Sequence, residues 1–138
     1  MRQLDDTDIE ILRLLAEDSS RSYSEIAEKV NLSTPSVSDR INRLKEVGVI
    51  KGFTVEIDRG QVGGESQMFV ELDVRPEKAD SVWDAVAEDS KVEHVVETAD
   101  SRILVLVHLA DNDVRSWLSG VTELSNLRDY DVSPVTRS

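Results

Sequence analysis

Side chains that can contact nucleic acid are concentrated between residues 33 and 43. Guanidinium groups pair with phosphates and guanine edges, and hydroxyl groups hydrogen-bond to phosphates or bases. Arginine on a surface helix is usually only solvated, but the helix signals around Arg40 and Arg43 favour a DNA-reading surface. The residues predicted to contact DNA are Ser33, Thr34, Ser36, Ser38, Arg40 and Arg43.

The helix that carries these side chains has clear boundary signals. Ser33 is a favourable N-cap, Pro35 is tolerated in the first turn, and Gly48 is a stop signal. Its buried stripe is predicted to consist of Val37, Ile41 and Leu44.

Two earlier helices are expected. Ser22 and Glu25 fit a capping box that opens a short helix ending near Asn31. Two short helices separated by a tight polar turn, the second one basic and exposed, are typical of a helix-turn-helix that reads the major groove. Asp5 or Asp6 caps the first helix. The apolar stripe predicted for that helix is Ile9, Leu12, Leu15 and Ala16.

The net charge of the 138-residue chain, −12, opposes DNA binding, because affinity for a duplex comes largely from lysine and arginine. The acidity is uneven: residues 1–52 carry −2 and residues 53–138 carry −10, whereas the segment 33–51 carries +2. Most of the acid therefore lies away from the predicted DNA surface. Only five of the sixteen basic residues are lysine, and the abundant Asp and Glu favour a salt-adapted, halophilic source over an ordinary acidic protein.

Composition excludes several function classes. Without cysteine the chain has no disulfide framework, thiolate metal site or cysteine nucleophile. No apolar run is long enough to span a bilayer, and the first residues lack a signal-type stretch. We therefore expect a soluble, cytoplasmic protein without a membrane partner, made of two small domains.

After Gly48 the hydrophobic period changes to two. Phe53, Val55 and Ile57 alternate as on one face of a connecting strand, and residues 59–66 have the composition of a loop. The remaining pattern predicts strands at 67–74, 91–98, 102–110 and 126–134, with helices at 77–88 and 112–124.

This βαββαβ order predicts a ferredoxin-like sandwich. The expected fold class is α+β. It comprises an N-terminal helix-turn-helix (winged-helix-like) domain at 1–50, a connecting strand and linker at 51–66, and a C-terminal ferredoxin-like domain at 67–138.

The strand at 103–107 is apolar at every position. Helices cover only one face of such a sheet, so the other face needs a second layer, most simply another copy of the chain. An ordinary central strand with a few exposed aliphatic residues is the alternative. We predict a dimer or higher oligomer whose interface includes Leu104 and Leu106.

Short motifs in the N-terminal half match a known family. They are Leu4-Asp5-x-x-Asp8-x-x-Ile11-Leu12, Ser24-Glu25-Ile26-Ala27, Leu32-Ser33, Arg40-Ile41-x-Arg43-Leu44 and Gly48-Val49-Ile50-Lys51-Gly52-Phe53-Thr54. Nearly the whole chain resembles the leucine-responsive regulator family, also called feast/famine or asparagine-regulator-like proteins. The resemblance implies a DNA-binding domain, a ferredoxin-like effector and dimerisation domain, and dimers that assemble further and often sense an amino acid between subunits.

One turn departs from the family pattern. The family usually has Gly-Asp-x-Asp-Tyr between the second and third strands of the C-terminal domain, and this chain has Ala99-Asp100-Ser101-Arg102-Ile103. A cation at position 102 predicts an effector with an extra acid group, such as an acidic amino acid or an oxo acid. A simple ion pair between Asp100 and Arg102 is an equal alternative. The candidate effector-binding residues are Thr98, Ala99, Asp100 and Arg102.

Metal or cofactor chemistry is not expected, because His94 and His108 lack a third ligand. A sequence-specific transcription regulator that binds double-stranded DNA is the leading function, with an architectural DNA-binding protein as the alternative. Siroheme decarboxylases share the two-domain layout, but their Arg-x-His-x-Asn-type stretch is missing from residues 98–102, so we predict no enzymatic activity.

Overall fold

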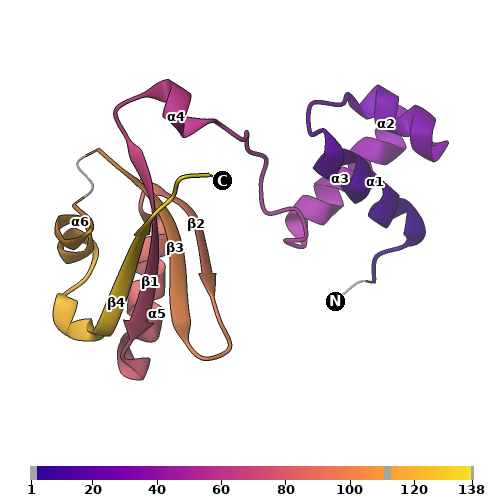
Figure 1. Cartoon of the computed structure of the whole chain (residues 1–138). Coiled ribbons are helices and arrows are strands. Elements are labelled where there is room, and N and C mark those ends of the chain that lie inside the picture. The colour runs from indigo at the N-terminus through magenta and orange to yellow at the C-terminus, as the bar shows by residue number, and fades with distance from the viewer. Residues whose placement is uncertain (1–2, 111–112, 138) are drawn as a thin grey trace. The chain divides into compact units, whose positions relative to one another are not determined.

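The computed structural model describes residues 3–110 and 113–137, and the chain divides into two compact units. The helical unit is residues 1–56 and the sheet unit is residues 57–138. Figure 1 shows the helices of the first unit and, in the second, a sheet with its own helices.

The helical unit contains α1 (Asp6–Glu17), α2 (Tyr23–Val30) and α3 (Thr34–Glu46). Each begins at a side-chain cap, which satisfies a backbone N–H that has no partner inside the helix. The capping side chains are Asp5, Ser22 and Ser33. Asn31 ends α2 with a left-handed φ of 59°, and Gly48 follows α3 with a φ of 80°. These boundaries confirm the predicted helix-turn-helix.

The three helices share one hydrophobic core. Its buried members are Ile11, Leu14, Leu15, Ile26, Ala27, Val37 and Ile41. Of the stripe predicted for α1 only Leu15 is buried, whereas Ile9 is 53% exposed. The prediction was wrong because α1 is apolar at six of eight positions from 9 to 16, so two overlapping stripes were possible. The structure turns Asp8, Ile11 and Leu15 inward.

The predicted connecting strand does not form. Residues 51–58 have no helix or strand, because none of the described strands pairs with them and an isolated strand is not stable. Phe53 and Val55 are 49% and 73% exposed, and Lys45 Nζ lies 5.2 Å from the centre of the Phe53 ring. The helix-turn-helix therefore has no β-wing among the described residues. The predicted loop contains a one-turn helix, α4 (Arg59–Val62).

The sheet unit has four antiparallel strands in the order β2-β3-β1-β4. They are β1 (Ser66–Val74), β2 (Val92–Glu97), β3 (Arg102–Leu109) and β4 (Leu127–Pro134). The helices are α5 (Ala79–Glu88), which follows a 3₁₀ turn at Pro76–Lys78, and α6 (Val114–Val121), which precedes a second 3₁₀ turn at Leu124–Asn126. This confirms the ferredoxin-like order. The predicted start of the second helix at residue 112 lies outside the described residues.

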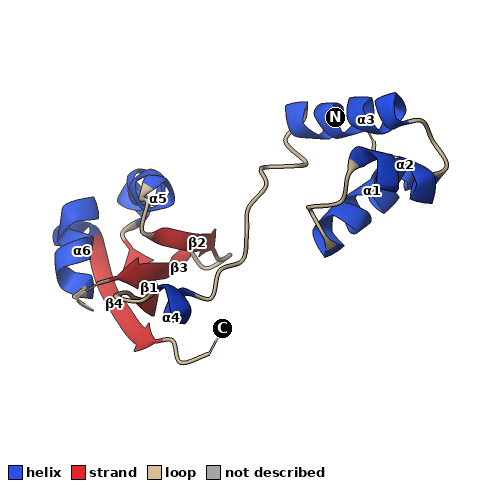
Figure 2. Cartoon of the chain, turned by 90° about the horizontal axis from the view of Figure 1, so that it is seen from above, coloured by secondary structure: helices blue, strands red, loops and turns tan. Residues whose placement is uncertain are grey.

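Both helices cover the same face of the sheet (Figure 2). Alternate residues of β1 and β3 point into this layer, where they meet the apolar sides of α5 and α6. The central members are Val70, Leu72, Val74, Val82, Val86, Ile103, Val105, Val107 and Leu118. On its solvent side α5 presents a row of exposed carboxylates: Asp80, Asp84 and Glu88.

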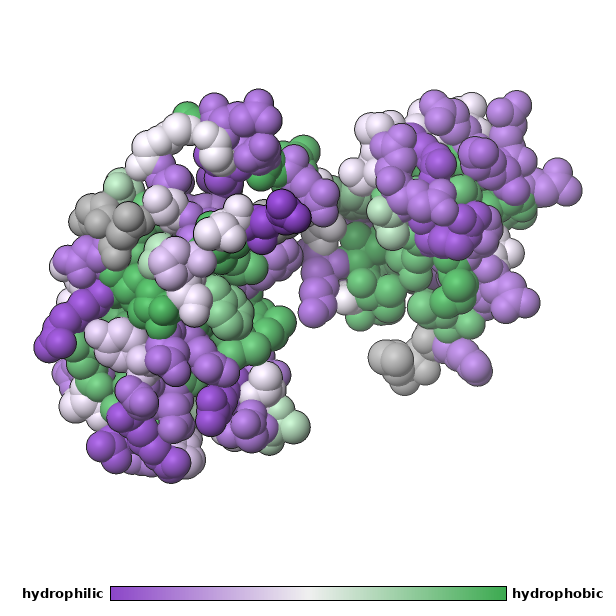
Figure 3. Space-filling view, in the orientation of Figure 1, coloured by the Kyte–Doolittle hydropathy of each residue, from purple (hydrophilic) through white to green (hydrophobic). Residues whose placement is uncertain are grey.

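The opposite face of the sheet, which we call the outer face, has no such layer. Leu104 and Leu106 are half-buried there, and Phe69 and Val96 are 36% and 53% exposed. In Figure 1 the strands of this unit lie in front of α5, so the outer face is toward the viewer. Figure 3, in the same orientation, shows hydrophobic residues among hydrophilic ones on this face. Among the described residues, no helix has the length and apolar character to cross a bilayer.

Candidate nucleic-acid interface and effector turn

The rotation of α3 about its axis is set by its buried residues. Val37 and Ile41 are fully buried and Leu44 nearly so. Because successive residues turn by about 100°, the side opposite this stripe must face solvent. Figure 2 shows α3 along one side of the helical unit, with α1 and α2 packed on its other side.

Arg40 is fixed against α1. Its Nη1 donates to Asp5 Oδ1 and Oδ2 at 2.8 and 2.7 Å and to Asp8 Oδ1 at 3.0 Å. The same two carboxylates form the capping box of α1: Asp8 N–H donates to Asp5, and Asp5 N–H donates to Asp8. One guanidinium therefore joins the first turn of α1 to the middle of α3.

This arrangement changes the charge state of its members. Hydrogen bonds from the Arg40 side chain and from the Asp8 N–H lower the pKa of Asp5 to about 2. The Arg40 pKa rises, first because of its hydrogen bond to Asp5. Two carboxylates thus compensate the Arg40 charge before any DNA is present. Arg40 thus positions α1 against α3, and its contact with DNA stays a prediction.

The other predicted DNA contacts have different surroundings. Ser33 Oγ accepts from Ser36 N–H at 3.2 Å and donates to Ser36 Oγ at 2.9 Å, so Ser33 serves as a cap. Thr34 is exposed, and Ser38 is partly exposed. No ion pair to Arg43 is found within the described residues, which leaves its charge available.

Two further cations accompany Arg43 at the end of α3. Lys45 and Lys51 are exposed, and the described residues hold no ion pair to either. In contrast, Arg13 pairs with Glu10 and Glu17 along α1. Together with Lys29 in the last turn of α2, these side chains are the lysine and arginine residues of the described helical unit that have no ion pair.

Sequence reasoning missed a row of exposed side chains on the side of α3 opposite its buried stripe. Pro35, Asp39, Asn42 and Glu46 are all exposed, and their spacing of four, three and four residues places them opposite the buried stripe. We call this row the outer ridge. The spacing of these residues is visible in the sequence, but they carry neither the cations nor the hydroxyl groups that usually indicate contact with DNA.

The candidate effector residues form one tight turn between β2 and β3. Thr98 N–H donates to Arg102 O at 2.9 Å, and Thr98 Oγ1 donates to the Asp100 carboxylate. That hydrogen bond lowers the Asp100 pKa. Arg102 lies 3.5 Å from both Asp100 Oδ2 and Glu71 Oε1, so the alternative of an ion pair within the turn is observed. Ala99 is exposed at the tip.

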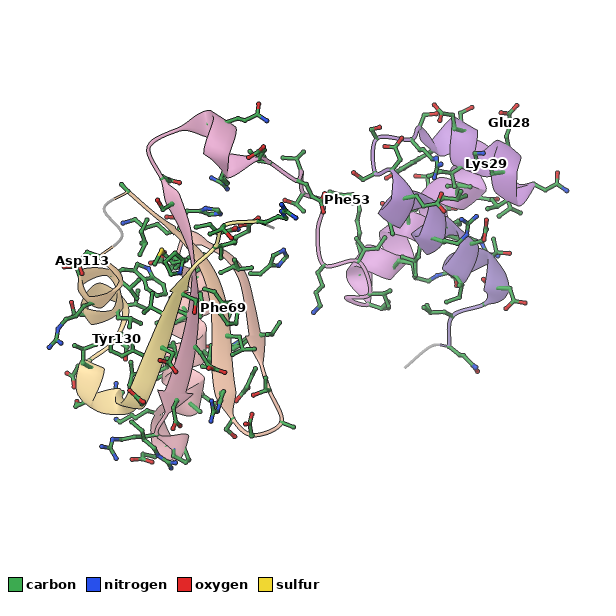
Figure 4. All side chains as sticks on the ribbon, in the orientation of Figure 1. Glu28, Lys29, Phe53, Phe69, Asp113 and Tyr130 are labelled. Atoms are coloured by element: carbon green, nitrogen blue, oxygen red, sulfur yellow. The ribbon has the colours of Figure 1, made fainter. Side chains whose placement is uncertain are left out.

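Arg102 also borders a shallow hollow of about 170 Å³ on the outer face. Its lining residues are Glu71, Asp73, Arg102, Asp129, Tyr130 and Asp131. Asp129 pairs with Asp73 and Asp131 with Glu71 across the strands, so like charges face each other. Figure 4 shows Tyr130 on β4 and Phe69 on the neighbouring β1. Four carboxylates against one guanidinium make this hollow negative.

The two histidines do not share an environment. His94 is exposed, whereas His108 is 3% exposed and its Nε2 lies 2.6 Å from Glu93 Oε2. Gln67 Nε2 donates to the same Glu93 oxygen at 2.6 Å. No group of three or more His, Cys, Asp or Glu suited to a metal ion occurs among the described residues.

The sequence and the fold are both similar to those of known DNA-binding regulators. Residues 4–45 match the AsnC-type helix-turn-helix domain. The chain is 34% identical over 140 residues to the HTH-type transcriptional regulator Rv2324 of Mycobacterium tuberculosis, covering 99% of this chain and 92% of that protein.

Solved structures with the same fold include PH0061 of Pyrococcus horikoshii, with a TM-score of 0.84, 25% identity, and coverage of 100% of this chain and 96% of that one. The regulator NMB0573 of Neisseria meningitidis, solved as a complex with L-Met, has a TM-score of 0.71 at 24% identity, with coverage of 98% and 91%.

Replacing Arg40 with alanine should destabilise the helical unit. The change leaves the largely buried Asp8 carboxylate without its cation, and we expect a loss of about 1 to 3 kcal/mol in unfolding free energy. Arg43→Ala is the matched control on the same helix and should stay within about 0.5 kcal/mol of the parent. Denaturant unfolding followed by circular dichroism measures both.

The difference between the Arg40→Ala variant and the parent should also depend on pH. Because the folded-state pKa of Asp5 is depressed from 3.8 to about 2, its stabilising contribution is complete above pH 3.8 and is lost as pH falls through 2. The two unfolding free energies should therefore converge over that range. Equal stability of the two proteins at pH 7 would contradict the positioning role of Arg40.

Proposed function

Because the chain belongs to the leucine-responsive regulator and AsnC family of DNA-binding transcription regulators, we propose that it binds specific DNA sequences through α3. The observation that carries this proposal is the fixed rotation of α3, which presents a polar row to solvent and leaves Arg43 uncompensated. In this proposal residues 1–50 bind DNA, residues 51–66 connect, and residues 67–138 dimerise and sense an effector.

Sequence-specific binding is favoured over architectural binding by charge. Sequence-independent affinity grows with the number of phosphates that lysine and arginine neutralise. The helical unit offers few uncompensated cations, since Arg13, Arg21 and Arg40 are held in ion pairs. Base contacts must therefore supply a large part of the binding free energy.

Arg43→Ala should weaken operator binding by about 1 to 3 kcal/mol if the side chain reaches a base edge. The operator duplexes are taken from a genome-wide map of the sites that the protein binds, measured in cells with and without a change of nutrients. Fluorescence anisotropy at one salt concentration compares each operator with a random duplex of equal length. Arg13→Ala is the control, because Arg13 is engaged along α1.

Equal affinity of the parent protein for operator and random duplexes would refute sequence-specific binding and support the architectural alternative. Unchanged operator affinity in Arg43→Ala would remove that residue from the interface.

The proposed oligomer is a dimer or larger assembly built on the outer face of the sheet. Leu104 and Leu106 lie on adjacent outward positions of β3, beside Phe69 on β1 and Val96 on β2. Helices cover only the other face, so these apolar side chains remain in contact with water in a single chain. A second copy placed on them removes that contact.

Leu104→Asp or Leu106→Asp should dissociate the full-length protein, because each places a carboxylate inside the apolar patch. Multi-angle light scattering gives the mass, and circular dichroism reports whether the variant is folded. Ile9→Asp is the control, since Ile9 is 53% exposed in the helical unit. A folded parent protein that is monomeric at every concentration tested would rule the interface out.

The proposed effector is an amino-acid-like molecule held at the β2–β3 turn beside the outer-face hollow. The L-Met complex of the Neisseria regulator, which has the same fold, supports this class of ligand. We infer a preference opposite to the one expected from Arg102 alone, because Glu71 and Asp100 already compensate that cation. The carboxylates of the hollow favour a ligand's ammonium group over a second acid group.

In a thermal-shift screen of amino acids and oxo acids, neutral or basic amino acids should raise the unfolding temperature more than glutamate or 2-oxoglutarate does. Asp131→Asn removes one carboxylate of the hollow and should reduce the shift. The largest shift for an acidic ligand, or an unchanged shift in Asp131→Asn, would contradict this assignment.

A further inference from the structure

The outer ridge of α3 raises a chemical question, because it carries carboxylates on a helix that faces DNA. Asp39 and Glu46 are both exposed, and the described residues hold no ion pair to either side chain. A carboxylate cannot accept a hydrogen bond from a phosphate diester and is repelled by it. Inside the major groove the favourable direct partners for a carboxylate are the exocyclic amino groups of bases.

We propose that Asp39 and Asn42 are the specificity-determining pair of this regulator. In this assignment, which rests on the proposed DNA-binding function, Asp39 accepts a hydrogen bond from the N4 amino group of cytosine. Asn42 binds the N6 and N7 edge of adenine through its amide.

The positions of the two side chains support a joint role. They lie three residues apart on the outer ridge, which corresponds to about 4.5 Å along the helix axis. Base pairs are about 3.4 Å apart, so Asp39 and Asn42 reach neighbouring base pairs when α3 lies along the groove. Asp39 and Asn42 are the sixth and ninth of the thirteen residues of α3, so they lie in the middle of the helix, opposite its buried stripe.

The anchoring of Arg40 strengthens this assignment. Its side chain reaches back to Asp5 and Asp8, so it does not occupy the outer ridge between Asp39 and Asn42. Asp39 also disfavours incorrect base pairs. A base pair that presents a hydrogen-bond acceptor at this position meets the carboxylate, which is itself an acceptor and offers no donor. The carboxylate thus lowers affinity for incorrect sequences as well as favouring the correct one.

The experiment is selection of binding sites from a random duplex library by the full-length protein, followed by affinity measurements on the selected site and its single-base variants. The proteins are the parent, Asp39→Asn, Asn42→Ala and Glu46→Gln. Glu46→Gln is the matched control, because it removes the same charge from the same ridge about 10 Å further along the axis.

Discrimination at one base pair, about 5- to 150-fold in the parent, should fall close to onefold in Asp39→Asn. Discrimination at a neighbouring pair should be lost in Asn42→Ala. Asp39→Asn should also bind random duplexes more tightly, since a charge that repels phosphates is gone. Glu46→Gln should keep the parent's base preferences at every position.

Selection of the parent's sequence with undiminished discrimination by Asp39→Asn or Asn42→Ala overturns the assignment of that residue. Loss of base preference in Glu46→Gln overturns the placement of the middle of α3 against the bases. A parent protein that selects no sequence refutes the proposed function itself, so the two failures are distinguishable.

Discussion

The ion pair between Arg40 and the first turn of α1 is the interaction on which the helical unit most depends. It joins two helices whose apolar contact alone does not fix their rotation, because α1 carries two overlapping hydrophobic stripes. Once Asp8 is turned toward Arg40, Ile11 and Leu15 enter the core and Ile9 is left outside. The buried stripe of α3 sets which of its sides meets solvent, and the Arg40 contact holds α1 against that helix.

The sheet unit follows from a different constraint. Both of its α-helices after β1 lie on one face of a four-stranded sheet, and β3 is apolar on both of its faces. The inner half of β3 completes a core with α5 and α6, and the outer half does not. The aliphatic residues on the uncovered side of this sheet are the physical basis of the proposed dimer.

The elements of this fold were largely predictable from local signals, since caps at Ser22 and Ser33 and the period-two pattern of the strands act over a few residues. The rotation of α1 was not predictable in this way, because it depends on a partner 32 residues away. The strand predicted around Phe53 does not form. Alternating apolar residues indicate a strand, but a strand also needs a second strand to pair with. At the candidate site, charge type alone did not reveal that Asp5 and Asp8 pair with Arg40 or that Glu71 pairs with Arg102, because these carboxylates are distant in sequence.

The carboxylate row on α5 has a consequence for how the protein meets a duplex. The sheet unit and DNA have charges of the same sign, and their repulsion extends over a Debye length, about 10 Å at 0.1 M salt and 3 Å at 1 M. Raising the ionic strength therefore removes an opposing force as well as the attraction of Arg43 and the nearby lysines. Association with DNA should lose less affinity per decade of salt than it does for a uniformly basic repressor.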